Sequence, residues 1–309
     1  MLKDSKVMLD RSNYKDPLSI MLSTLNLNVD ICLNAQFCGS WLLGTKSGEK
    51  SFHLISHGEC VLELEGQVPQ TLHSGDLMIF MRQVNHRLVP NIETQAESER
   101  SDYQAGINSA ATGILCGSFS YENTKTESLM RALPAALIIP NCEQSKRWIN
   151  PLVKLIQLES TEPNLGSDLL IKKLTESLII QAIRSYLRAG DFEVGMLKLV
   201  ADNKLSKALL AVQNEPHLAW TVDLLAKECS MSRTAFATHF KQTSSWSPME
   251  YVTWWRMQSA WSKLIKGESI GAVSESIGYR SEAAFSRVFK KAFDVGPGEV
   301  RAKYNEVGI

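Results

Sequence analysis

Hydrophobic and polar residues alternate with a period of two in the first part of the chain, over residues 30–120. Within Cys60–Glu65, Cys60, Leu62 and Leu64 fall on one face and the two glutamates on the other. Successive side chains of a strand point to opposite faces, so this pattern indicates a half-buried antiparallel strand. Similar short runs recur between turn residues, at Phe52–Ile55, Leu77–Met81 and Ile114–Phe119. Their spacing predicts an antiparallel β-barrel or jelly roll.

The apolar period changes to that of a helix from about Gln144 onward. Apolar residues then recur at steps of three and four, first over 148–158 and again from Gly166-Ser167 to Tyr186. This spacing predicts two amphipathic helices. Two uses of the helices are open and compatible: they cover the barrel, or they also supply a dimer seam. Between the predicted strands, residues 93–112 are mostly small or polar and predict a loop.

Two segments of the last hundred residues repeat one another. Ser232–Lys241 and Ser281–Lys290 are 49 residues apart and share Ser, Ala, Phe, Phe and Lys at the same offsets. Each begins with serine, which is a favoured N-cap, and each carries two phenylalanines four residues apart, which form an apolar stripe. One such segment is typical of any helical hairpin. Two in register indicate a duplicated functional unit.

A short helix and a turn are predicted before each repeat. Thr221–Cys229 leads to Ser230-Met231 in the first unit, and Ser269–Ile277 leads to Gly278 in the second. A short helix, a tight turn and a capped second helix form a helix-turn-helix, whose second helix enters the major groove of DNA. Residues Pro248–Ile265 predict one long helix between the units. That helix would hold the two reading helices about 34 Å apart, which is one turn of DNA.

Residues 204–304 resemble the DNA-binding domain of the AraC/XylS family throughout. The matching residues include Trp220-Thr221, Ser247-Pro248-Met249, Trp255-Arg256-Met257 and the run Gly278–Arg287. Ser274 departs from the pattern because alanine is usual there, and Ser245-Trp246 replaces a turn that usually contains glycine. The resemblance implies a transcription regulator whose partners are double-stranded promoter DNA and RNA polymerase.

The resemblance also places base-facing side chains on both second helices, at Thr234, Ala237, Thr238, Glu282, Ala283, Ser286 and Arg287. Arg287 is the strongest candidate for a specific contact, because a guanidinium can bind guanine O6 and N7 together, worth ~1–3 kcal/mol of discrimination. The first helix has few long polar side chains, so we expect it to read methyl groups and DNA shape. Phosphate contacts are expected from the basic residues Arg233, Lys241, Arg256, Lys290 and Lys291.

The N-terminal half resembles the cupin module that precedes this DNA-binding domain in many family members. The residues that carry the resemblance are Phe52–Glu59, Leu72–Leu77 and Asn85-His86, and it extends to about residue 190. It implies a small barrel that can bind a small-molecule effector and help the chain to dimerise. His53 and His86, with Cys116, form one candidate effector or metal site, since these residue types bind first-row metals. Structural or surface histidines are the alternative.

Composition changes this picture little. The chain has 44% hydrophobic and 21% charged residues and no net charge, but residues 204–309 hold 14 Lys and Arg against 10 Asp and Glu. Six cysteines without a CxxC pair, and no apolar stretch of ~20 residues, predict a cytoplasmic protein without a membrane span.

We therefore predict an α+β protein. A cupin-like sensor and dimerisation domain spans residues 1–190, a linker spans 191–203, and an all-α domain with two helix-turn-helix units spans 204–309. We expect a dimeric regulator without enzymatic activity and assign it no cofactor. Two alternatives stay open: a metal-binding cupin enzyme fused to a DNA-binding domain, for which no triad or carboxylate pair is found, and an effector-independent DNA-binding protein. The effector, the operator and the direction of regulation are not determined.

Overall fold

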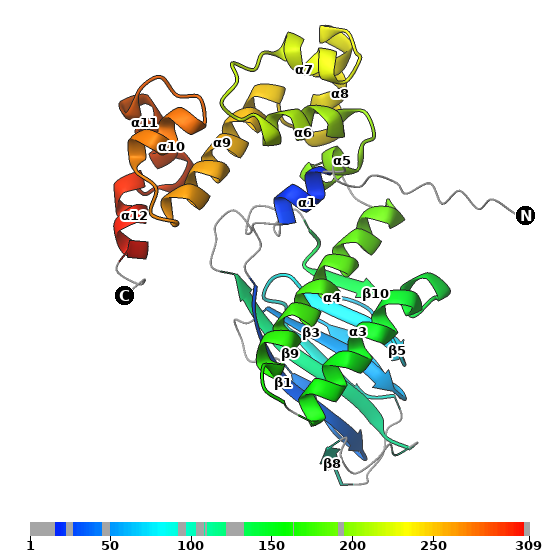
Figure 1. Ribbon diagram of the computed structural model, residues 1–309. Coiled ribbons are helices and arrows are strands. Elements are labelled where there is room, and N and C mark those ends of the chain that lie inside the picture. The colour runs from blue at the N-terminus through cyan, green and yellow to red at the C-terminus, as the bar shows by residue number, and fades with distance from the viewer. Residues whose placement is uncertain are drawn as a thin grey trace, which may run out of the picture. The chain divides into compact units, whose positions relative to one another are not determined.

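The computed structural model describes residues 16–22, 27–44, 50–91, 97–102, 108, 110–121, 133–162, 164–190 and 195–305. They belong to two compact units, Leu25–Phe192 and a second unit that joins Met1–Thr24 to Glu193–Ile309 (Figure 1). The first unit is built on strands and the second on helices, so the predicted α+β class is confirmed. Within the described parts of the chain, none of the helices has the length and apolar character that crossing a membrane requires.

Two antiparallel sheets make up the first unit. The larger has the strand order β10-β6-β3-β9-β1-β8 and the smaller the order β2-β7-β4-β5. The strands are β1 (Leu27–Cys38), β2 (Leu43–Gly44), β3 (Lys50–His57), β4 (Glu59–Leu64), β5 (Gln70–His73), β6 (Leu77–Phe80), β7 (His86–Pro90), β8 (Glu99–Asp102), β9 (Thr112–Tyr121) and β10 (Ala136–Ile139). The four apolar runs of the sequence lie in β3, β4, β6 and β9, apart from Met81, which follows β6 directly.

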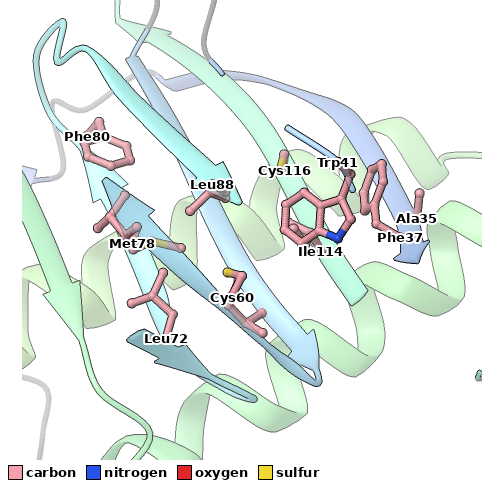
Figure 2. Packing of buried hydrophobic residues seen from close by; sticks show 12 residues of the cluster. Ala35, Phe37, Trp41, Cys60, Leu72, Met78, Phe80, Leu88, Ile114 and Cys116 are labelled. Atoms are coloured by element: carbon pink, nitrogen blue, oxygen red, sulfur yellow. The ribbon is translucent and has the colours of Figure 1, made fainter. Parts of the chain in front are cut away.

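Apolar side chains from both sheets fill the space between them, and we refer to the two packed sheets as the barrel (Figure 2). In β4, Cys60 and Leu62 are completely buried, as their period of two predicts. Leu72 of β5 and Leu88 of β7 join them from the same sheet, while the larger sheet supplies Ala35, Phe37, Ile55, Met78, Phe80, Ile114 and Cys116. Burial of this apolar surface is the main force that holds the sheets together.

The loop expected over residues 93–112 contains the strand β8, so this part of the prediction is wrong. Residues 99–102 pair with the end of β1, where Ala35 lies opposite Asp102 and Cys38 opposite Glu99. The sequence Glu-Arg-Ser-Asp has no apolar alternation, because β8 is the last strand at its edge of the sheet. Backbone hydrogen bonds to β1 hold it, and these leave no mark on side-chain pattern.

The helices α3 (Glu143–Thr161) and α4 (Ser167–Ala189) pack on one another, and α4 also packs on β1 and β10 (Figure 1). Their buried residues include Ile149, Val153, Ile156, Leu178, Ile179, Ala182 and Ile183. The helix pair thus covers the larger sheet, which is the first of the two uses that the sequence left open. Leucines that face away from this contact remain exposed, namely Leu155, Leu158, Leu169 and Leu170.

The second unit consists of helices. They are α1 (Pro17–Leu22), α5 (Met196–Ala201), α6 (Leu205–Asn214), α7 (Val222–Glu228), α8 (Arg233–Ser244), α9 (Pro248–Leu264), α10 (Ile270–Ser276), α11 (Glu282–Phe293) and α12 (Pro297–Asn305). The pairs α7–α8 and α10–α11 are the two helix-turn-helix units, and both pack on the long helix α9. The segment 191–203, expected to be a linker, contains α5, which packs on α6 and α8 because Met196, Leu197 and Leu199 are buried.

Replacing Gly117 tests the packing of β9 against its two neighbours in the larger sheet. A Cβ atom at this position would overlap the ring of Phe52 and come within 2.7 Å of the carbonyl oxygen of Asp30. We expect Gly117→Ala to lower the free energy of unfolding by about 1–3 kcal/mol, the usual cost of overpacking. Urea unfolding followed by circular dichroism measures it. Gly44→Ala, whose Cβ would meet its nearest atom at 3.8 Å, is the matched control; equal losses in both variants would contradict the prediction.

Candidate nucleic-acid interface and the polar chain of the barrel

The two reading helices, α8 and α11, begin and pack in the same way. The side chains of Ser232 and Ser281 accept hydrogen bonds from the backbone N–H groups of Ala235 and Ala284, which caps each helix. The phenylalanine pairs are buried: Phe240 packs near Tyr251 of α9, and Phe289 stacks on Trp261 of α9, with ring centroids 5.8 Å apart. Because the phenylalanines face α9, the opposite side of each reading helix is left to solvent.

The structure leaves all seven predicted base-facing side chains accessible. Five are exposed and two partly exposed, in the set Thr234, Ala237, Thr238, Glu282, Ala283, Ser286 and Arg287. Glu282 differs in one respect, since its carboxylate lies over Gly271 of α10, where a Cβ atom would come within 2.6 Å of Oε1. Their contacts with bases stay a prediction.

The predicted phosphate-binding residues fall into two groups. Lys241, Lys290 and Lys291 are exposed, and Arg233 is exposed while paired at 3.0 Å with Asp223 of α7. Arg256 is different. Its Nε and Nη2 atoms donate hydrogen bonds to the backbone carbonyl oxygens of Pro216 and Leu218, at 2.8 and 2.7 Å. Burial lowers the pKa of Arg256 from its ordinary value. These bonds hold the guanidinium against the chain's own backbone, and a phosphate contact by Arg256 stays a prediction.

In the barrel, the three residues proposed as a candidate site do come together. His53 of β3 lies opposite Cys116 of β9 in the strand register, and its Nδ1 is 2.8 Å from the Cys116 Sγ. Its Nε2 is 2.8 Å from Nε2 of His86, which belongs to β7 of the other sheet. His86 Nδ1 is 2.9 Å from the carbonyl oxygen of Val84. All three side chains are buried, and the chain of contacts joins the two sheets.

The partners of these atoms determine where the protons lie. A carbonyl oxygen only accepts, so His86 donates from Nδ1 to Val84, and the Nε2 of a neutral His86 must accept. His53 therefore donates from Nε2, and its Nδ1 accepts a hydrogen bond from the thiol of Cys116. The result is a one-way chain from Cys116 through His53 and His86 to Val84. Every member is neutral and every polar atom in it has a partner.

Burial keeps this chain neutral. It lowers the pKa of His53 from 6.5 to about 3, with repulsion from His86 as the second cause. Burial also lowers the pKa of His86, against the opposing effect of its bond to Val84, and it raises the pKa of the Cys116 thiol. Burying an ion costs far more than burying a neutral, hydrogen-bonded group. Cys116 is consequently a thiol, not a reactive thiolate.

The same geometry bears on metal binding. Cys116 lies at Nδ1 of His53 and His86 lies at Nε2, on opposite edges of one imidazole ring. One ion cannot contact both edges of a ring, so these three side chains cannot all bind one metal in this arrangement. Among the residues that the structure describes, no group of three or more His, Cys, Asp or Glu side chains is arranged to hold a metal ion.

The buried histidines should make the stability of the barrel depend on pH. The pKa of His53 is lower in the folded state than in the unfolded chain, so the unfolded state binds more protons between pH 6.5 and about pH 3. Stability therefore falls as the pH drops through this window. We expect a loss of about 2 kcal/mol from His53 between about pH 8 and pH 5. Urea unfolding followed by circular dichroism at both pH values measures it.

His53→Gln is the decisive variant for this prediction, because an amide keeps a donor and an acceptor but does not take up a proton. It should remove the part of the pH dependence that His53 contributes, about 2 kcal/mol, whereas the control His73→Gln, at an exposed histidine of β5, should retain that part. A wild-type pH dependence in His53→Gln would contradict the account of the chain.

Comparison with known proteins agrees with both units. The family described as Cupin matches residues 16–188, more than half of the chain, and the family described as Helix-turn-helix domain matches residues 225–303. An AraC-like transcription regulator of Streptomyces antibioticus is 28% identical over 297 residues, which cover 93% of this chain and 98% of that protein. An HTH-type transcriptional regulator of Haemophilus influenzae is 28% identical over 284 residues, covering 88% and 93%.

A third relative is the HTH-type transcriptional regulator AlkR of Acinetobacter baylyi, which is 27% identical over 302 residues, covering 93% of this chain and 99% of that protein. These matches extend over both units, and they agree with the duplicated reading helices and the two-sheet barrel. The chain belongs to the cupin family through residues 16–188, and it is a DNA-binding transcription regulator of the AraC type.

Proposed function

We propose that this regulator binds promoter DNA as a homodimer and that a small molecule bound by its barrel modulates the binding. The observation that carries the proposal is the duplicated reading helix: α8 and α11 bury equivalent phenylalanines on α9 and leave equivalent polar faces accessible. Two such faces on one long helix match two successive major grooves of one DNA duplex. The domain limits 1–190 and 204–309 belong to the same proposal.

The two helices would read DNA by different means. On α11, Arg287 is exposed and can form a bidentate pair with guanine. On α8, Thr234, Ala237 and Thr238 offer methyl groups and short hydroxyl groups, which suit thymine methyls and groove shape. Lys241, Lys290 and Lys291 are exposed at the ends of the two helices and would contact phosphates. Their contribution would be affinity and salt dependence without sequence preference.

In the barrel, the proposed effector site is the chain of His53, His86 and Cys116. It places neutral donors and acceptors between two sheets whose shared interior is otherwise lined by apolar side chains. An uncharged molecule that is mainly apolar and carries one hydrogen-bonding group suits such surroundings, because both histidines are held neutral. Binding would be felt by both sheets at once, since the chain joins them.

The surface of α3 and α4 supports the homodimer. Leu155 and Leu158 lie one helical turn apart on α3, and Leu169 and Leu170 follow on α4; all four are exposed. Apolar patches of this kind mark interaction surfaces. A second copy of the chain would cover them, as the dimer seam expected from the sequence requires.

RNA polymerase as a partner, a cytoplasmic location and the lack of enzymatic activity complete the proposal. The similarity to three transcriptional regulators supports it. Transcription from the chain's own promoter region with purified RNA polymerase, with and without the regulator, tests the partner and reports the direction of regulation.

Arg287→Ala tests the proposed reading of DNA. We expect it to lose about 1–3 kcal/mol of preference for the selected sequence while it keeps its affinity for random DNA, because a bidentate pair with a base is removed. Lys290→Ala is the matched control on the same helix. It should weaken binding to all sequences equally and reduce the salt slope by about one unit. Equilibrium binding to both kinds of DNA over a salt series measures these quantities. Unchanged sequence preference in Arg287→Ala would contradict its role.

Leu158→Asp tests the dimer seam. Burying a leucine contributes about 1.5–3 kcal/mol, so a charged replacement at a buried interface position should weaken association tenfold or more. Sedimentation velocity of the full chain over a concentration series measures the dissociation constant. Leu42→Asp replaces a leucine that is also exposed but lies outside α3 and α4, and it should leave association unchanged. Equal association of Leu158→Asp and the wild type would place the interface elsewhere.

A further inference from the structure

The loop between α6 and α7 leads into the first helix-turn-helix unit and also touches the second one, because His217 lies against Gly278. It is a tight turn: Leu218 N–H donates to the Glu215 carbonyl, and the backbone N–H of Trp220 donates to the Leu218 carbonyl, at 3.2 and 2.7 Å. The indole Nε1–H of Trp220 also donates to Glu215, at 2.8 Å. Thr221 then caps α7. The turn therefore leads directly into α7, the first helix of the first helix-turn-helix unit.

Arg256 ties this turn to α9. Two of its N–H groups bind the carbonyl oxygens of Pro216 and Leu218, and its guanidinium carbon lies 5.9 Å from the centroid of the Tyr279 ring. Hydrogen bonds from a charged donor are about twice as strong as neutral ones. A guanidinium over an aromatic face adds a cation–π attraction. One side chain therefore contacts the loop before α7 and, at the same time, Tyr279 in the turn between α10 and α11.

The turn between α10 and α11, in the second helix-turn-helix unit, contacts the same loop directly. Gly278 has φ +83°, and a Cβ atom there would overlap the carbonyl oxygen of His217 and lie 3.0 Å from its carbonyl carbon. Only glycine allows both the left-handed backbone and this close approach. Tyr279, the next residue, packs against Phe285 of the reading helix α11, with ring centroids 5.9 Å apart. Contacts therefore connect the loop before α7, through Gly278 and Tyr279, to the reading helix α11.

We propose that Arg256 is a positioning residue that sets the spacing and angle between the two reading helices. We refer to its bonds with Pro216 and Leu218, its contact with Tyr279, and the fit of Gly278 against His217 as the clasp. The long helix α9 joins the two helix-turn-helix units through apolar contacts, which are non-directional and by themselves would leave each unit free to tilt. The clasp joins them a second time, at the turns, and two points of attachment remove that freedom. This inference rests on the proposed function, in which both helices read one duplex.

The clasp would act on operator spacing. A rigid pair of readers accepts half-sites at one separation only, because a change of one base pair rotates the second site by about 34–36° and moves it by 3.4 Å. A loosened pair tolerates neighbouring separations. A residue that bound phosphate would act differently: its loss would weaken all binding and reduce the salt slope by about 0.9.

Selection from a random-sequence duplex library measures the spacing directly and requires no known operator. The full-length wild type, Arg256→Met and Gly278→Ala would each be selected in parallel, and the separation between the two enriched motifs tabulated. We expect one dominant separation for the wild type. Both variants should lower the preference for it over separations one base pair shorter or longer about tenfold, with the salt slope unchanged. Lys263→Met, a basic residue on α9 that pairs with Glu268 instead, is the matched control and should keep the wild-type distribution.

Each outcome decides a separate point. No enriched motif with the wild type would overturn the proposed function itself. If the wild type and both variants all select two motifs at one separation, the clasp is overturned but the proposed function stands. A reduced salt slope in Arg256→Met would instead support a phosphate contact by Arg256. Thermal unfolding accompanies each selection. If Arg256→Met does not fold, Arg256→Lys supplies the measurement, because lysine retains the charge but lacks the planar fork with which arginine binds the two carbonyl oxygens.

Discussion

The burial of paired aromatic side chains on α9 is the constraint on which the DNA-reading unit depends. Phe236, Phe240, Phe285 and Phe289 are completely buried, and the helices that carry them, α8 and α11, pack on α9 and on the short helices beside it. Their burial turns the two reading helices so that polar residues face outward. The serine caps add to this by starting both helices at equivalent positions. The presentation of a reading surface is thus a consequence of core packing.

The barrel depends on a second constraint, because a chain of polar side chains crosses its apolar interior. Two buried imidazoles and a thiol are tolerated there because each donor meets an acceptor and none carries charge. Because the chain joins the two sheets, uptake of a proton by either histidine would disturb both sheets together.

Gly117 and Gly278 show how the fold constrains positions that have no side-chain chemistry. Gly117 lets β9 approach Phe52 and the backbone of β1, and Gly278 lets the second turn rest on the loop before α7. In each case a methyl group would occupy space already filled. The absence of a side chain at these two positions therefore permits the close packing of β9 in the large sheet and the contact between the second turn and the loop before α7.

Periodicity predicted the elements whose side chains alternate between core and solvent. The strands β3, β4, β6 and β9 and the helix pair α3–α4 follow directly from it, whereas both helix-turn-helix units were predicted from repeated residues. Periodicity failed for β8, which pairs with β1 through backbone bonds, and for α5, whose short apolar run was assigned to a linker. His53, His86 and Cys116 could be named as candidates from residue type and resemblance. Their contact could not, because it joins strands that are far apart in sequence.

The sequence by itself determined the duplicated reader and the class of protein, since local patterns and repeated residues encode both. Only the tertiary structure showed which groups Arg256 contacts. Its position on α9 beside the buried Trp255 is equally compatible with a phosphate contact and with an internal bond. The choice depends on where the carbonyl oxygens of Pro216 and Leu218 come to lie after folding. Long-range geometry of this kind arises from packing across the whole unit, and no local pattern records it.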